Sequence, residues 1–84
     1  MSKYKVPYIY GFWERIEKAV EESGMSKAEI ARKMGCDRKI FYLGRRQQTM
    51  MSAGYIAKFC VATGVSADYI LGLKSEGVSN ARIH

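Results

Sequence analysis

Apolar residues recur at helical spacing along the middle of the chain. From residue 12 they stand at i, i+4, i+7 and i+8 with charged residues between them, which predicts an amphipathic helix that ends at Gly24. The apolar positions are Phe12, Ile16, Ala19 and Val20. Ser26 and Glu29 then form an S-x-x-E capping box, so a second helix is predicted over about 26–34 and stopped at Gly35. Its inward positions are Ile30, Ala31 and Met34.

Three further helices follow from similar signals. Asp37 is a good N-cap for a third helix that reaches Leu43 or Gly44, and residues 44–51 are expected to form a basic and polar loop. Ser52 is expected to cap a fourth helix through Thr63, and Ser66 a short fifth one, ADYILG. The inward positions of these helices are Phe41, Ile56, Phe59, Cys60, Ile70 and Leu71. Since no strand-like alternation appears, the chain is expected to be an all-α, five-helix domain.

The ends of the chain differ from its middle. The Tyr-rich residues 1–11, with Pro7, do not fit a helical period and are expected to form an extended N-terminal arm. The helical domain spans 12–72, and 73–84 form a polar C-terminal tail. A chain of 84 residues has room for one small domain, which is marginal alone and would gain from dimerisation.

The positive charge is concentrated in one stretch. The chain has a net charge of +6, and residues 25–46 hold seven bases against two acids. Such a concentration is either a solvated face or a surface that binds a polyanion.

Several other classes of function have no support in the sequence. No apolar run approaches the ~20 residues that span a bilayer, and the N-terminus lacks a signal-peptide pattern, so a cytoplasmic location is expected. Cys36 and Cys60 stand apart, with no CxxC and no neighbouring His. They are expected to be small core residues rather than a disulfide or metal site. The sequence has no paired acid and base, no activated nucleophile and no phosphate loop, so neither an enzyme nor a cofactor is expected.

The two helices around Gly35-Cys36-Asp37 have the pattern of a helix-turn-helix. With FWERIEKAVEESGMSKAEIARKMG, then SAGYIAKFCVATG, and VSADYILGL, the chain resembles the Cro/repressor (Xre-like) family over about 12–72. The resemblance implies a lambda-repressor-like DNA-binding fold, usually dimeric, that represses transcription from a palindromic operator. Its third helix would enter the major groove.

The resemblance also implies roles for particular residues. Arg38 and Lys39 would read base edges from the first turn of the third helix, with Tyr42 and Leu43 one turn further along. Leu43 could instead pack against the following loop. The DNA backbone would be contacted by Lys27, Arg45 and Arg46.

The sequence departs from the family at the end of the third helix. The family usually has a large apolar residue where Gly44 stands and often a Gly where Gln47 stands. Without that large residue the end of the helix is poorly anchored, and Ile40 or Leu43 could turn inward to fill the gap.

Two matters of assembly and function stay open at this point. A homodimer could form through the fifth helix and its flanks, at Tyr69 and Leu73, or through the arm at residues 8–10; Tyr69 and Leu73 could also close the domain's own core. The competing function is a protein-interaction module on the same fold, an antirepressor or antitoxin-like partner. The exposed apolar residues of the third helix and the Tyr-rich arm favour it, and the charge of residues 25–46 argues against it.

Overall fold

The computed structural model describes residues 8–74, which contain five helices. They are α1 (Phe12–Ser23), α2 (Lys27–Met34), α3 (Ile40–Gln47), α4 (Ala53–Thr63) and α5 (Ala67–Ile70). No β-strand occurs between residues 8 and 74, so the all-α prediction is confirmed for this part of the chain. Most of the predicted arm (1–7) and of the predicted tail (75–84) lies outside the described residues.

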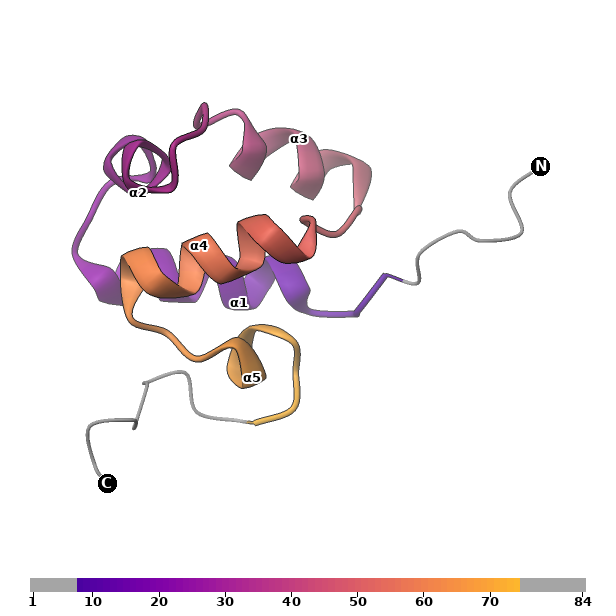
Figure 1. Cartoon of the computed structure of the whole chain (residues 1–84). Coiled ribbons are helices and arrows are strands. Elements are labelled where there is room, and N and C mark those ends of the chain that lie inside the picture. Colours follow the sequence, from indigo (N-terminus) through magenta and orange to yellow (C-terminus); the bar gives the residue numbers. More distant parts are fainter. Residues whose placement is uncertain (1–7, 75–84) are drawn as a thin grey trace, which may run out of the picture.

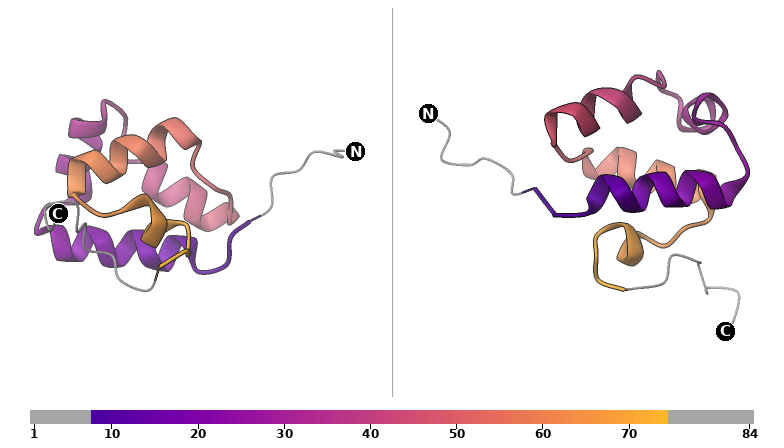
Figure 2. Two further views of the ribbon diagram at one scale, coloured as in Figure 1. Left: turned by 60° about the horizontal axis from the view of Figure 1, so that its bottom comes forward. Right: turned by 180° about the vertical axis from the view of Figure 1, so that it is seen from behind.

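The helices are arranged around a central pair. α1 and α4 lie in the middle, α2 and α3 cover one side of them, and α5 lies on the opposite side (Figure 1). The same order is visible from behind (Figure 2, right). None of the helices within residues 8–74 has the length and apolar character that crossing a bilayer requires.

The core lies where all five helices meet. The side chains that were predicted to face the core are buried, apart from those of Cys60 and Leu71, which are half-buried. The Phe41 ring of α3 meets the Phe59 ring of α4 edge to face, with ring centroids 5.9 Å apart. Such pairs contribute about 0.5–1.5 kcal/mol beyond the area that they bury. α3 is therefore held to the core through an aromatic contact with α4.

The predicted helix starts are confirmed for α2, α4 and α5. Ser26 Oγ accepts from the Glu29 backbone N–H, and Glu29 Oε1 accepts from the Ser26 N–H, both at 3.1 Å. Ser52 and Ser66 cap α4 and α5 by accepting from the N–H three residues on. Each such cap stabilises its helix by typically ~1 kcal/mol.

The predicted bounds of the third helix are wrong at both ends. The Asp37 carboxylate accepts from the Lys39 N–H at 2.8 Å, and residues 37–39 form a tight turn before α3, whose N-cap is Lys39. At the other end the helix continues through Gly44 to Gln47, and Gln48 ends it with φ 53°. Gly44 therefore lies inside the helix. Its missing Cβ leaves room for α3 to approach α1.

Candidate nucleic-acid interface

The turn that joins α2 to α3 carries two of the predicted base-reading residues. Gly35, with φ 75°, ends α2, and Arg38 and Lys39 follow in the turn 37–39. Both side chains are exposed. They therefore lie just before α3 rather than in its first turn, although Lys39 keeps the helical backbone conformation.

α3 presents a row of exposed side chains on the side opposite Phe41. Positions 39, 42, 43 and 46 are spaced at i, i+3, i+4 and i+7, and so form one ridge along a helix. This outer ridge consists of Lys39, Tyr42, Leu43 and Arg46. Tyr42 is 49% exposed and Leu43 is 47% exposed, so Leu43 does not turn into the core. Leu43 also lines a hollow with Thr49 and Met50 of the following loop.

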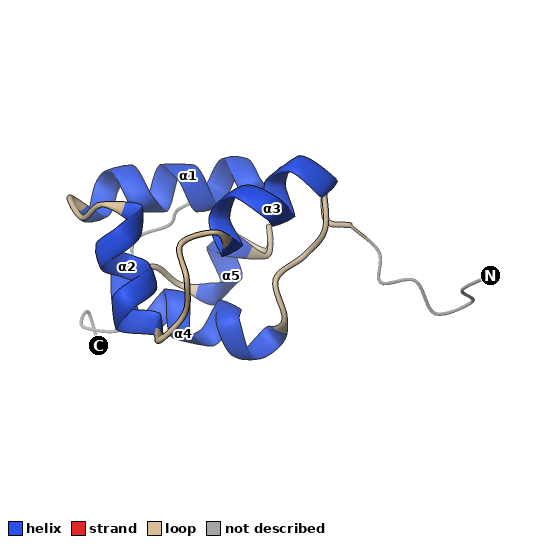
Figure 3. Ribbon diagram, turned by 90° about the horizontal axis from the view of Figure 1, so that it is seen from above, coloured by secondary structure: helices blue, strands red, loops and turns tan. Residues whose placement is uncertain are grey.

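Trp13 anchors the end of α3, which the sequence had predicted to be loose. Its ring packs against Gly44, where an added Cβ would overlap Cζ2 of the indole. Its Nε1–H donates to the Thr49 carbonyl at 2.8 Å, just after the helix. Figure 3 shows α3 lying across the space between α1 and α4. The ring from α1 thus replaces the large side chain that was expected at position 44, and Ile40 is half-buried beside it.

Two of the three predicted phosphate-contacting residues meet at one acidic side chain. Glu17 Oε2 of α1 lies 2.9 Å from the Lys27 ammonium at the start of α2 and 3.1 Å from an Arg45 guanidinium nitrogen of α3. This oxygen is shielded from solvent and makes no aligned hydrogen bond, so both contacts are ion pairs. Lys27 also lies 4.9 Å from the centre of the Tyr42 ring, a cation–π distance. Arg46 has no ion-pair partner within residues 8–74.

The charge of this region is of one sign. Residues 38–48 hold four bases and no acid, and all four bases are exposed. The nearest compensating charges are Asp37 in the turn and Glu17 on α1. The arrangement favours binding of an extended anion along α3 rather than a small one in a closed pocket.

The two predicted dimer residues, Tyr69 and Leu73, differ in their exposure to solvent. Tyr69 is only 7% exposed and packs in the domain's own core, whereas Leu73 is 72% exposed. Between α4, α5 and the segment before α1 lies an apolar groove of about 590 Å³. Its lining includes Ile9 from the predicted arm and Leu71 from the end of α5. Neither Tyr69 nor Leu73 lines this groove.

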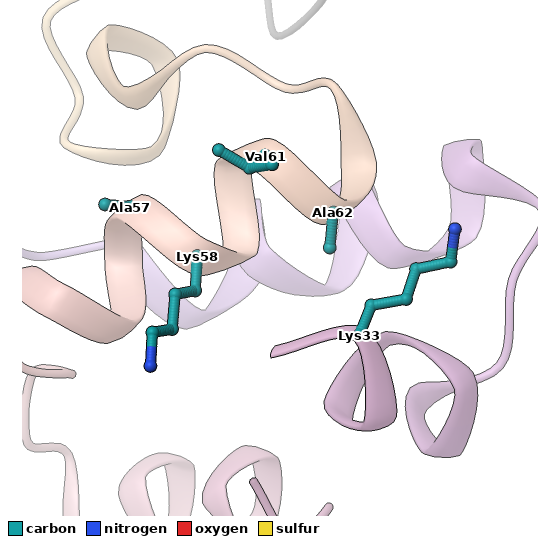
Figure 4. A pocket seen from close by; sticks show the side chains of 5 residues that line it. All are labelled: Lys33, Ala57, Lys58, Val61 and Ala62. Atoms are coloured by element: carbon teal, nitrogen blue, oxygen red, sulfur yellow. The ribbon is translucent and has the colours of Figure 1, made fainter. Parts of the chain in front are cut away.

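A second hollow lies between α4 and Lys33 of α2. It measures about 370 Å³, and α4 contributes most of its lining (Figure 4). Ala57 and Val61 line it from α4, and the ammonium groups of Lys33 and Lys58 point in different directions at its edge.

Both cysteines are free and pack against the core, as predicted. Burial raises the pKa of the Cys60 thiol above its ordinary value of 9.0. Burial also raises the pKa of the Cys36 thiol. The positive charge of Lys58 lowers this pKa and the negative charge of Asp37 raises it, both by less than burial does. A raised pKa keeps both groups as unreactive thiols at neutral pH.

Sequence reasoning missed two residues of this region. Trp13 was not assigned to the core, and nothing in local spacing links it to Gly44, which lies 31 residues further along the chain. Glu17 was counted only as part of the acidic first helix. Its spacing of four residues from Glu21 and three from Glu14 gave no sign of which one would meet Lys27.

Comparison with known protein families gives no match for this chain, and comparison with curated proteins gives no significant match.

Proposed function

We propose that the protein is a double-stranded DNA-binding transcriptional regulator whose α2, turn and α3 act as a helix-turn-helix. In this proposal α3 enters the major groove and reads base edges, and α2 and the flanking bases hold the DNA backbone. Repression of transcription by occupying an operator is the expected outcome.

The observation that carries the proposal is the outer ridge of α3. It combines two bases with an aromatic and an aliphatic side chain, all exposed, on a helix whose opposite side is fixed by Phe41 and Gly44. Lys39 or Arg46 can donate to the O6 and N7 of guanine, and Leu43 can contact a thymine methyl. A helix that presents only such groups outward has the chemistry of direct readout.

The remaining bases have two different proposed roles. Arg38 lies in the turn before α3, where it can reach a base edge or the adjacent phosphate. Lys27 and Arg45 lie beside the ridge and are proposed to contact phosphates, which fix the register of the protein on the duplex.

The same proposal includes a homodimer that assembles through the groove between α4 and α5. One α3 reads only a few base pairs, and two copies about one helical turn apart would read two half-sites. The groove is lined by residues of α4 and α5 together with Ile9, Met50 and Met51. α5 lies on the opposite side of α1 and α4 from α3 (Figure 1), and the exposed Leu73 follows α5. A second copy is the proposed occupant, because a domain of 84 residues buries little surface alone.

A protein-interaction module is the competing proposal. The exposed Tyr42 and Leu43 of α3 favour it, since both could pack against an apolar partner. The four exposed bases of residues 38–48 favour DNA.

The test is a titration of duplex DNA with the full chain, followed by fluorescence anisotropy at several salt concentrations. Affinity is expected to fall steeply between about 50 and 200 mM salt, with a log–log slope of about −0.9 for each phosphate neutralised. The double variant Lys39→Ala/Arg46→Ala is expected to lose binding. The charge-matched control Lys18→Ala/Lys74→Ala, away from α2 and α3, is expected to keep most of it. Failure of the full chain to bind duplex DNA at low salt would refute the DNA proposal.

A further inference from the structure

The contact between Glu17, Lys27 and Arg45 brings three helices to one oxygen atom. Glu17 Oε2 belongs to α1, the ammonium 2.9 Å away belongs to the first residue of α2, and the guanidinium 3.1 Å away belongs to α3. The side chains of Glu17 and Lys27 are about three-quarters buried, while that of Arg45 is 55% exposed. The cluster therefore opens toward solvent on the α3 side.

A carboxylate oxygen between an ammonium and a guanidinium has the same surroundings as a bound phosphate oxygen. Both anions accept charge-assisted hydrogen bonds from Lys and Arg, and the guanidinium fork suits either one. The two bases converge on this point from α2 and α3. The position of Oε2 thus identifies a place where an anionic oxygen is stabilised by two positive side chains.

We propose that the Glu17 carboxylate occupies the position that a DNA backbone phosphate takes in the complex. When a duplex binds, the phosphate displaces the carboxylate from Lys27 and Arg45. The inference rests on the proposed DNA-binding function and adds an internal competitor to it. No covalent bond forms or breaks in the exchange. Glu17 releases the two bases, the phosphate takes their ion pairs, and the carboxylate returns to water.

The geometry of the contact suits such an exchange. Glu17 Oε2 makes no aligned hydrogen bond that would have to be replaced, and the open Arg45 side chain can move with the incoming anion. Partly exposed ion pairs of this kind are weak, so a phosphate of a polyanion can compete for them. Glu17 consequently lowers the affinity for every duplex, whatever its sequence.

The test compares Glu17→Gln with the matched control Glu22→Gln in the full chain. Both variants remove one negative charge from α1, but Glu22 is exposed, has no ion pair within residues 8–74 and stands five residues further around the helix. On random duplex DNA at low salt, Glu17→Gln is expected to bind several-fold more tightly than the unchanged protein. Its log–log salt slope is expected to stay close to that of the unchanged protein, because the same phosphate is neutralised in both complexes. Glu22→Gln is expected to change affinity by less than about twofold, because its charge is distant and screened.

A second measurement does not depend on DNA. Inorganic phosphate is titrated into each variant while the side-chain NMR signals of Lys27 and Arg45 are followed. Glu17→Gln is expected to show saturable shifts of both signals at lower phosphate concentration than the unchanged protein or Glu22→Gln. Thermal unfolding of all three proteins checks that the substitution leaves them folded.

The outcomes separate the two proposals. If the unchanged protein binds duplex DNA but Glu17→Gln binds no more tightly than Glu22→Gln, the exchange is refuted and the DNA-binding function stands. If no variant binds DNA but Glu17→Gln alone gains phosphate affinity, the anion-binding site between Lys27 and Arg45 is supported and the DNA-binding function is refuted. If neither measurement distinguishes Glu17→Gln from the other two proteins, the anion-binding site is refuted.

Discussion

The indole ring of Trp13 occupies the space that a side chain at residue 44 would need. A Cβ on Gly44 would overlap Cζ2 and lie 3.0 Å from Cη2 of the ring, while the indole Nε1–H holds the Thr49 carbonyl at 2.8 Å. The distance of α3 from α1, and the continuation of α3 past residue 44, therefore depend on the contact between the Trp13 indole and a residue without a side chain.

The first prediction follows from this pairing. Gly44→Ala is expected to lower the free energy of unfolding by about 1–2 kcal/mol, because overpacking costs about 1–3 kcal/mol and the helix preference for Ala returns at most about 1. Urea unfolding gives the change. The matched control is Gly54→Ala, at an exposed position of α4 with open space around an added Cβ. It is expected to stabilise the protein by up to about 1 kcal/mol, and equal effects of the two substitutions would contradict the packing argument.

The second prediction concerns coupling between the two residues. Trp13→Phe removes the hydrogen bond to Thr49 and leaves space beside Gly44, so by itself it is expected to cost roughly 1–3 kcal/mol. In the double variant Trp13→Phe/Gly44→Ala the added methyl enters that space. The double variant is expected to be more stable than the sum of the single effects by about 0.5 kcal/mol or more, measured as a double-mutant cycle. Simple additivity would mean that the ring and the glycine do not share the space.

The third prediction separates base reading from backbone contact. Arg38→Ala is expected to cost ~1–3 kcal/mol on the preferred site and to relax the base preference at one position. Arg45→Ala is expected to weaken all sequences alike and to flatten the salt slope by less than 0.9, since Lys27 would still contact the same phosphate. Selection of bound sequences from random duplexes gives both preferences. An equal loss from Arg38→Ala on selected and random DNA would make Arg38 a backbone contact.

The fourth prediction concerns alkaline pH. The pKa of Cys60 is raised by burial, so the folded state holds its thiol proton more tightly than the unfolded chain does. The stability due to this thiol is present below about pH 9 and is lost as pH rises through the folded pKa. The difference in unfolding free energy between the unchanged protein and Cys60→Ala is expected to decrease above about pH 9. Because the variant shares every other titrating group, a difference that stays constant with pH would contradict the burial effect.

The fifth prediction concerns assembly. Two chains are expected to bind each duplex at saturation, on selected sites with two-fold symmetry. Ala57→Glu, at an exposed position of α4, would place a charge in the groove between α4 and α5 and is expected to abolish the second chain, while thermal unfolding checks that the first stays folded. Sedimentation with and without DNA gives the stoichiometry. One chain per duplex on unsymmetric sites would show that the dimer proposal is wrong.

The sequence predicted well those features that depend on neighbouring residues. The caps at Ser26, Ser52 and Ser66 and the inward faces of α1 and α2 follow from local spacing, and the structure confirms them. The end of α3 was predicted wrongly because Gly44 has two possible meanings in sequence. It resembles a helix stop, yet here it is a point of close approach to a ring that lies 31 residues earlier in the chain.

The candidate site was predictable in its residue types and only partly in its arrangement. Charge counting located the basic stretch, and helical spacing placed Tyr42 on its outside but left Leu43 undecided. The ion pairs of Glu17 join residues 10 and 28 positions apart, so nothing in local spacing selects this acid over its neighbours on α1. Long-range pairing of this kind requires the packed structure.

One side of α3 packs against the core and the other side is exposed, so substitutions on the two sides differ in their effect on the fold. Phe41 and Gly44 fix where the helix lies, while Lys39, Leu43 and Arg46 contribute almost nothing to the core. Exchange of the outward residues therefore leaves the fold nearly unaffected. If α3 reads DNA as proposed, a small number of substitutions on its outward side would change the binding preference, whereas a change at Trp13 would shift the whole of α3 at once.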